Sequence, residues 1–120
     1  MYTALVLTEA SRQTLLREFP PRADWEWVAH HMTINMGPAK DGPAADLLGQ
    51  SFGMIVKMWA RDEKVLAVGV WTNCPSVNPI KHITIEVNRA AGGKPKDSNQ
   101  LTEWKDYYGI ELFGTVEEVG

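Results

Sequence analysis

Cysteine is nearly absent from this chain, since Cys74 is the only one among 120 residues. A single cysteine cannot form an intrachain disulfide, and it excludes a zinc site built from several cysteines. Because oxidising compartments favour paired cysteines, a reducing compartment is the simplest setting for this sequence. We therefore expect a cytoplasmic protein, either of a cell or of a phage that acts in the cytoplasm of its host.

The sequence also lacks a long apolar run and a basic leader. No stretch approaches the ~20 apolar residues that a membrane-spanning helix needs. The apolar start of the chain ends after a few residues, and no basic segment precedes it, so the sequence predicts no signal peptide. We expect no membrane partner.

Positive charge is not in excess, because 12 Lys and Arg residues stand against 15 Asp and Glu residues, for a net charge of −3. A broad electrostatic grip on long duplex DNA needs many phosphate contacts and is not expected. A small phosphate-bearing ligand held by a few local cations is compatible with this charge. The length and the hydrophobic fraction of 44% predict a single domain over residues 1–120.

The order of apolar and polar residues predicts an α+β fold. Thr8 is a suitable N-cap for a helix that runs to about Glu18, where Pro20 and Pro21 end it. A second, short helix is expected after residue 97. The expected strands are residues 2–7, 25–36, 52–60, 65–72, 81–88 and 110–119. They should pair mainly antiparallel in two small sheets around a central cleft, with the helices outside.

Two segments repeat the pattern His-x-Thr-apolar. Residues 31–34 read His-Met-Thr-Ile, and residues 82–85 read His-Ile-Thr-Ile. Side chains alternate between the two faces of a strand, so each histidine shares a face with its threonine, about 7 Å away. Two such strands side by side would place two imidazoles and two hydroxyls over one cleft.

This set of side chains suits the cleavage of a phosphodiester. One group must take a proton from the attacking oxygen, and another must protonate the leaving oxygen. Histidine titrates near pH 6.5, so His31 and His82 can hold opposite protonation states in neutral solution. The hydroxyls of Thr33 and Thr84 can donate to the non-bridging phosphate oxygens. This scheme requires no metal and no other cofactor.

The two motifs resemble those of the two-histidine (2H) phosphoesterase superfamily, whose members carry a pair of His-x-Thr/Ser-x motifs with hydrophobic x residues. The family includes bacterial RNA 2′,3′-cyclic phosphodiesterases, the cyclic phosphodiesterase domains of transfer-RNA ligases, and phage enzymes that cleave cyclic oligonucleotide signals. The resemblance implies a bilobal α+β fold with a pseudo-two-fold axis and no metal. It also implies that His31 and His82 are the acid–base pair and that Thr33 and Thr84 bind the phosphate.

We therefore expect a metal-independent phosphodiesterase that hydrolyses a cyclic or linear phosphodiester of RNA ends, oligonucleotides or cyclic nucleotides. The small, acidic chain favours a nucleotide or a short RNA as the substrate. One alternative is a binding module that holds a nucleotide or RNA end in the same cleft without turnover. Another is an interaction domain whose motifs match by accident, in which case the two histidines would lie far apart.

Further residues are candidates for contact with the substrate. Lys94, Lys96 and Ser98 belong to a glycine-rich basic loop after the second motif, which either clamps a phosphate or is simply solvated. Trp25 and Tyr107 are the aromatic residues that we expect at the rim of the cleft, although most aromatic side chains belong to a core.

Strand alternation assigns the side chains next to the motifs. His30 should face away from His31, as a structural or rim residue. Asn35 should share the face of His31, and Glu86 that of His82, where each would orient an imidazole, hold a ribose hydroxyl or simply face water. A metal site built from all three histidines is disfavoured, because adjacent strand residues cannot both face one ion.

Overall fold

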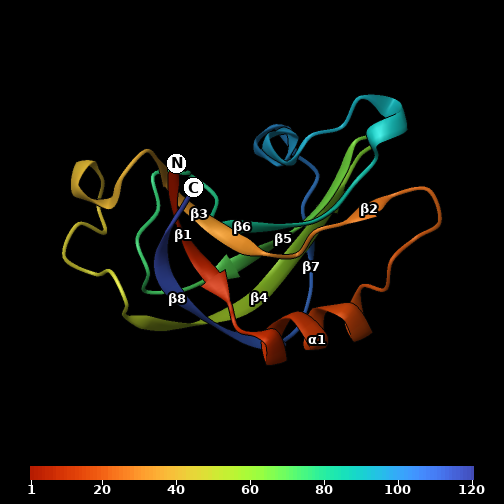
Figure 1. The fold of residues 1–120 in the computed structure, drawn as a ribbon. Helices are drawn as coiled ribbons and strands as arrows, with labels where there is room; N and C mark the ends of the chain where they lie inside the picture. Colours follow the sequence, from red (N-terminus) through yellow and green to blue (C-terminus); the bar gives the residue numbers. More distant parts are fainter.

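The computed structural model describes residues 1–120 as eight strands, one α-helix and three 3-10 helices (Figure 1). The strands are β1 (Tyr2–Leu7), β2 (Glu26–Trp27), β3 (His31–Met36), β4 (Ser51–Arg61), β5 (Val65–Trp71), β6 (His82–Val87), β7 (Lys105–Asp106) and β8 (Glu111–Val119). The helices are α1 (Glu9–Glu18), η1 (Ala39–Asp41), η2 (Arg89–Ala91) and η3 (Pro95–Gln100). An α+β fold with antiparallel strands is therefore confirmed.

Six strands pair antiparallel in a closed ring, in the order β1-β3-β6-β5-β4-β8 and back to β1. The short strands β2 and β7 add to β6 and β4. The protein thus has one closed sheet and not the two small sheets that we expected, because β6 pairs with both β3 and β5. Strands β3 and β6 pair with each other, and β1 and β5 flank them on either side. The two motif strands are neighbours as a result.

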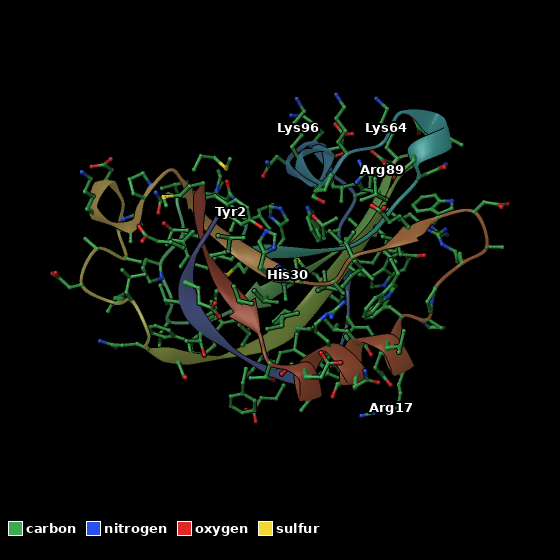
Figure 2. The ribbon with its side chains drawn as sticks, viewed as in Figure 1. Tyr2, Arg17, His30, Lys64, Arg89 and Lys96 are labelled. Atoms are coloured by element: carbon green, nitrogen blue, oxygen red, sulfur yellow. The ribbon has the colours of Figure 1, made fainter.

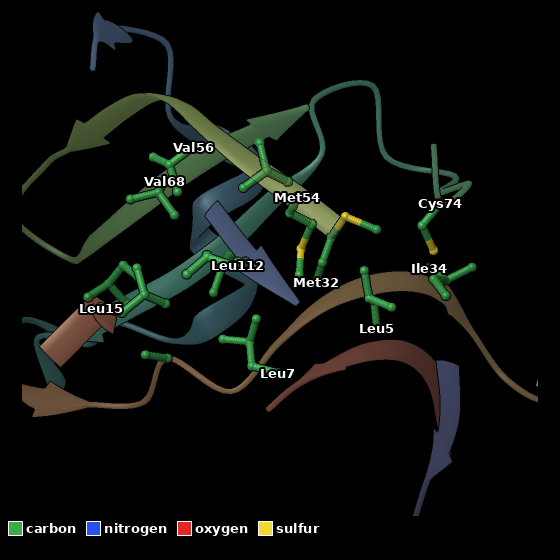
Figure 3. Close-up of a cluster of buried hydrophobic side chains, with 14 of the residues drawn as sticks. Leu5, Leu7, Leu15, Met32, Ile34, Met54, Val56, Val68, Cys74 and Leu112 are labelled. Atoms are coloured by element: carbon green, nitrogen blue, oxygen red, sulfur yellow. The ribbon is translucent and has the colours of Figure 1, made fainter. Parts of the chain in front are cut away.

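The closed sheet encloses the main hydrophobic core (Figure 3). This cluster has 17 buried residues, and its large members include Leu5, Met32, Ile34 and Ile83, which are fully buried. Burying each such side chain contributes ~1.5–3 kcal/mol to folding. The apolar residues of both motifs belong to this cluster. The core therefore fixes which face of β3 and β6 carries the histidines.

The segment 25–36, which we expected to be one strand, is divided into β2 and β3. The break between the two strands lies at residues 28–30, where Ala29 is fully buried and has a left-handed φ of 35°. Such a φ is uncommon for a residue with a Cβ and interrupts the alternation of a strand. The Nε of Arg12 in α1 donates to the Ala29 carbonyl over 3.0 Å, which holds this turn in place. Strand β3 consequently begins at His31, and His30 precedes it.

The sequence predicts the start of α1 correctly but places the start of the second helix too late, since η3 begins at Pro95. Thr8 is the N-cap of α1, and its hydroxyl accepts the N–H of Ser11 over 3.1 Å. The short helix near residue 97 is η3, where the carboxylate of Asp97 accepts the N–H of Lys94 over 2.9 Å. Helix α1 lies on one side of the sheet and η3 on the opposite side (Figure 1). None of the helices has the length and apolar character needed to cross a membrane.

Gly93 is required by a close approach of the backbone. A Cβ at this position would collide with the carbonyl oxygen of Lys64 and would lie 2.8 Å from that of Asn88. We expect Gly93→Ala to lower the free energy of unfolding by about 1–3 kcal/mol, because backbone must move to make room. Urea denaturation measures this loss.

Gly53→Ala is the matched control, since its Cβ would meet only the Phe113 ring at an ordinary distance of 3.6 Å. It should change the unfolding free energy by less than about 1 kcal/mol. Equal stability of the Gly93→Ala variant and the wild type would contradict the packing described for this loop.

Candidate active site

The pairing of β3 with β6 brings the two motifs together. Met32 lies directly opposite Ile83, and both side chains are buried in the core. One step along this antiparallel register places His31 opposite Thr84 and His82 opposite Thr33, all on the face that points away from the core. The two histidines are then diagonal neighbours, whose Cα atoms lie ~7–8 Å apart. The two imidazoles therefore leave neighbouring strands on the same face of the sheet.

A β-bulge lies at the last residue of each motif, Ile34 in β3 and Ile85 in β6. The register of β1 against β3 shifts after Ala4 opposite Thr33, and that of β5 against β6 shifts after Ala67 opposite Thr84. The extra residue in each motif strand turns the next side chain toward the other face. Both motif strands therefore present a His-x-Thr pair outward and then change the direction of their polar side chains.

These bulges correct the positions expected for Asn35 and Glu86. The Nδ2 of Asn35 donates to the carbonyl of Pro38 over 3.3 Å, and the side chain is buried. Glu86 is 1% exposed and accepts the Nε and the backbone N–H of Arg22, each over 2.9 Å. Neither side chain shares a face with a motif histidine, so neither orients one.

His82 is held by a backbone carbonyl. Its side chain is 9% exposed, and its Nδ1 donates to the carbonyl of Ile80 over 2.7 Å. Because a carbonyl can only accept, Nδ1 carries a proton in both charge states. Nε2 is therefore the atom of His82 that can give or take a proton.

His31 lies between two other rings. The Tyr2 ring packs against it with centroids 4.9 Å apart, and the His30 ring meets it edge-on at 5.2 Å. The Nδ1 atoms of His30 and His31 are 3.0 Å apart, so one of them donates to the other. Our expectation that His30 faces away from His31 is wrong, because His30 precedes the strand and follows the left-handed Ala29.

The surroundings of His31 disfavour its charged form. Burial, the charge of His30 and the charge of His82 lower the pKa of His31 from 6.5 to about 4. The effect of His82 requires the two motif histidines to be close enough to interact. At neutral pH His31 is therefore uncharged and can accept a proton.

The two threonines differ in their hydrogen bonds. The Thr84 hydroxyl contacts the Ser98 hydroxyl over 2.7 Å and the Pro95 carbonyl over 3.3 Å, both in η3. Ser98 is 2% exposed, so this link is a fixed part of the fold. The Thr33 side chain makes no such bond and is half-buried, which leaves its hydroxyl available to a ligand.

A hollow of about 190 Å³ adjoins His82. Its lining comes from the start of β6 and the segment before it, from η3 and from the segment after η3. The lining residues are Asn78, Pro79, Ile80, His82, Ser98, Asn99, Leu101 and Trp104. A second hollow of about 290 Å³ shares Pro79 and Ile80 with the first and extends to Trp71. These two residues form the wall between the hollows.

The basic loop lies on the same side of the molecule as η3. Figure 2 shows Lys96 there, with Lys64 and Arg89 along the same edge, while Arg17 lies at the opposite edge beside α1. Lys94 and Lys96 are exposed and form no ion pair, whereas Arg89 pairs with Glu26. Both lysines are free to meet a ligand anion.

The two aromatic candidates lie elsewhere. The Tyr107 hydroxyl donates to Glu18 of α1, and its ring packs against Phe19. The Trp25 ring stacks under the Arg22 guanidinium, 3.7 Å from the ring centroid. None of these contacts joins either ring to the motif histidines. Both rings have structural partners of their own.

The chain contains no group of three or more His, Cys, Asp or Glu side chains arranged to hold a metal ion. His30 and His31 are in contact, but these two side chains and His82 do not converge on one point as three metal ligands would. The chemical groups at the site are therefore two imidazoles, one free hydroxyl and nearby ammonium groups.

Comparison of the chain with family models, with curated proteins and with solved structures finds no match. The interpretation of the site therefore depends on its side-chain geometry.

Three contributors to the site could not be placed correctly from the sequence. Nothing in the sequence links Tyr2 to the site, because the apolar segment 2–7 predicts only a buried strand. The carbonyl of Ile80 could not be assigned without the loop that places it two residues before His82. His30 did carry a signal, since two adjacent histidines are visible in the sequence, but strand alternation assigned it to the wrong face.

The lowered pKa of His31 predicts how the protein responds to acid. The unfolded chain takes up this proton near pH 6.5, whereas the folded protein takes it up only near pH 4. Stability should therefore fall as the pH is lowered from 6.5 to 4, and this part of the slope should be missing in His31→Gln. Urea denaturation across this pH range measures the slope, and NMR titration of the imidazole measures the pKa directly. A His31 pKa at or above 6.5 would contradict the environment described.

Proposed function

We propose that the protein is a metal-independent phosphodiesterase that uses His31 and His82 as an acid–base pair. The observation that carries this proposal is the register of β3 against β6, with Met32 opposite Ile83. Catalytic groups must reach one phosphate within hydrogen-bond range, and diagonal neighbours on one face meet that requirement. The adjacent motif strands and the bulge at the end of each motif support a variant of the bilobal two-histidine phosphoesterase fold.

We assign His31 as the base and His82 as the acid. The lowered pKa of His31 favours a neutral imidazole, which is the form that accepts a proton. The Ile80 carbonyl bound to Nδ1 of His82 leaves Nε2 as the atom from which His82 gives a proton to the leaving oxygen. With one histidine neutral and the other charged, the pair avoids two like charges at short range.

The reaction proceeds by displacement at phosphorus. Nε2 of His31 takes a proton from the attacking water, and the water oxygen forms a new bond to phosphorus. The bond from phosphorus to the leaving ribose oxygen breaks, and Nε2 of His82 gives that oxygen its proton. A cyclic phosphodiester thereby becomes a phosphomonoester with a free hydroxyl, and each histidine regains its starting state by proton exchange with water.

Other groups hold the phosphate and orient the base. The free hydroxyl of Thr33 donates to a non-bridging oxygen, while Thr84 acts through its bond to Ser98 by fixing η3 over the site. In this scheme His30 orients His31 by accepting its Nδ1–H, the direction of their contact that leaves Nε2 of His31 free to take a proton. Lys94 and Lys96 add positive charge near a phosphate-bearing ligand.

The size and charge of the site favour a nucleotide or a short RNA end as the substrate. The hollow beside His82 holds about 190 Å³, which is small for an extended oligonucleotide. The net charge of −3 gives no broad attraction for long nucleic acid.

Leaving-group dependence tests the two roles. Wild type, His31→Ala and His82→Ala are assayed in EDTA with a nucleoside 2′,3′-cyclic phosphate and with a nucleoside p-nitrophenyl phosphate. His31→Ala should lose ~10²–10⁴-fold activity on both, since both reactions need a base. His82→Ala should lose a similar factor on the cyclic phosphate but less than about 10-fold on the aryl ester, because p-nitrophenolate leaves without a proton.

Met36→Ala is the matched control, because Met36 ends the same strand and is 76% exposed. It should keep wild-type activity on both substrates. Equal losses of His82→Ala on both substrates would contradict its role as the acid. Binding of a nucleotide without any turnover would favour the binding module.

A further inference from the structure

We propose that the hollow beside His82 is a nucleobase-binding subsite, so that the substrate is a nucleotide whose base enters this hollow. This inference rests on the proposed function, because it places the phosphate of the same nucleotide between the two motif histidines. The inference specifies one further part of the substrate, a single heteroaromatic base attached to the ribose whose phosphate reacts.

The position of the hollow follows from the fold. Its lining includes His82 on one side and η3 on the other, and η3 is held over β6 by the bond of Ser98 to Thr84. Leu101 packs with Ala67 and Val87 in a second buried cluster, which anchors the far end of η3. The hollow is therefore bounded by fixed parts of the molecule.

The size of the hollow suits one ring system. Pockets for drug-sized ligands hold roughly 300–1,000 Å³, and this one holds about 190 Å³. A single base is within this size, whereas two nucleotides are not. The ribose and phosphate of the same nucleotide then remain outside, toward His31 and Thr33.

The lining combines apolar walls with amide groups. Pro79, Ile80, Leu101 and Trp104 supply apolar surface for the faces of a ring, and an aromatic side chain is the usual partner for base stacking. Asn78 and Asn99 each carry an amide that both donates and accepts, as the edge of a base requires. The indole N–H of Trp104 is buried and has no acceptor within the protein.

The lining also contacts the catalytic groups. Ile80 holds His82 through its carbonyl and lines the hollow, and Ser98 holds Thr84 and lines it as well. A base in the hollow therefore touches the residues that position one histidine and one threonine. A sugar phosphate without a base would leave this contact unmade.

Two measurements test the subsite. The first compares kcat/KM for uridine and adenosine 2′,3′-cyclic phosphates with that for glycerol 1,2-cyclic phosphate, which has no base. The second follows the NMR signals of the Trp104 indole and the Asn99 amide while free uridine or adenosine is added, so that no phosphate is involved.

Wild type should prefer the nucleoside substrates by roughly 5- to 150-fold, the range of base stacking on an aromatic residue. Trp104→Leu and Asn99→Ala should each reduce this preference, because each should lose more activity on the nucleoside substrates than on glycerol cyclic phosphate. Asn99 is exposed, so its variant should fold even if Trp104→Leu does not. Gln100→Ala is the control, because Gln100 is an exposed neighbour in η3 that does not line the hollow.

Each result separates this inference from the proposed function. Turnover with no preference for a base, or with equal loss on both substrate types, would overturn the subsite and leave the phosphodiesterase standing. Nucleoside-induced shifts at Trp104 and Asn99 without turnover of any substrate would support the subsite and overturn the catalytic proposal. An absence of these shifts at millimolar nucleoside would overturn the subsite whatever the kinetics.

Discussion

The pairing of Met32 with Ile83 is the contact on which the site depends. It is the one residue pair that joins β3 to β6, and it closes a ring of six antiparallel strands. Both side chains are buried in the core, so the residues on either side of them must face outward. A slip of one residue in either strand would send its histidine into the core and expose apolar side chains instead. The hydrophobic core therefore determines the placement of the catalytic candidates.

The two halves of the site are alike in their strands and different in their surroundings. Each motif ends at a bulge, yet His31 contacts two rings while His82 contacts a backbone carbonyl. Burial and neighbouring charge lower the pKa of His31 to about 4, and the carbonyl of Ile80 fixes the tautomer of His82. A symmetric pair of motifs is thus converted into two groups with different proton chemistry. This difference is what a base and an acid require.

Sequence patterns predicted the elements that depend on local signals and missed those that depend on tertiary contacts. Alternation correctly separates His31 and Thr33 from Met32, because strand geometry alone decides it. It fails at Asn35 and Glu86, since a bulge depends on the partner strand and leaves no trace in the motif itself. The left-handed turn before His30, the closure of the sheet and the cover formed by η3 likewise depend on distant parts of the chain.

The most direct test of the central claim is a crystal structure with uridine vanadate, an analogue of the five-coordinate transition state. The account predicts vanadium between the two motif histidines, with one vanadate oxygen within hydrogen-bond distance of Nε2 of His31 and another within that distance of Nε2 of His82. The Thr33 hydroxyl should contact a third oxygen. Vanadate that contacts only one histidine, or that binds away from β3 and β6, would contradict the claim that the two strands together form one catalytic site.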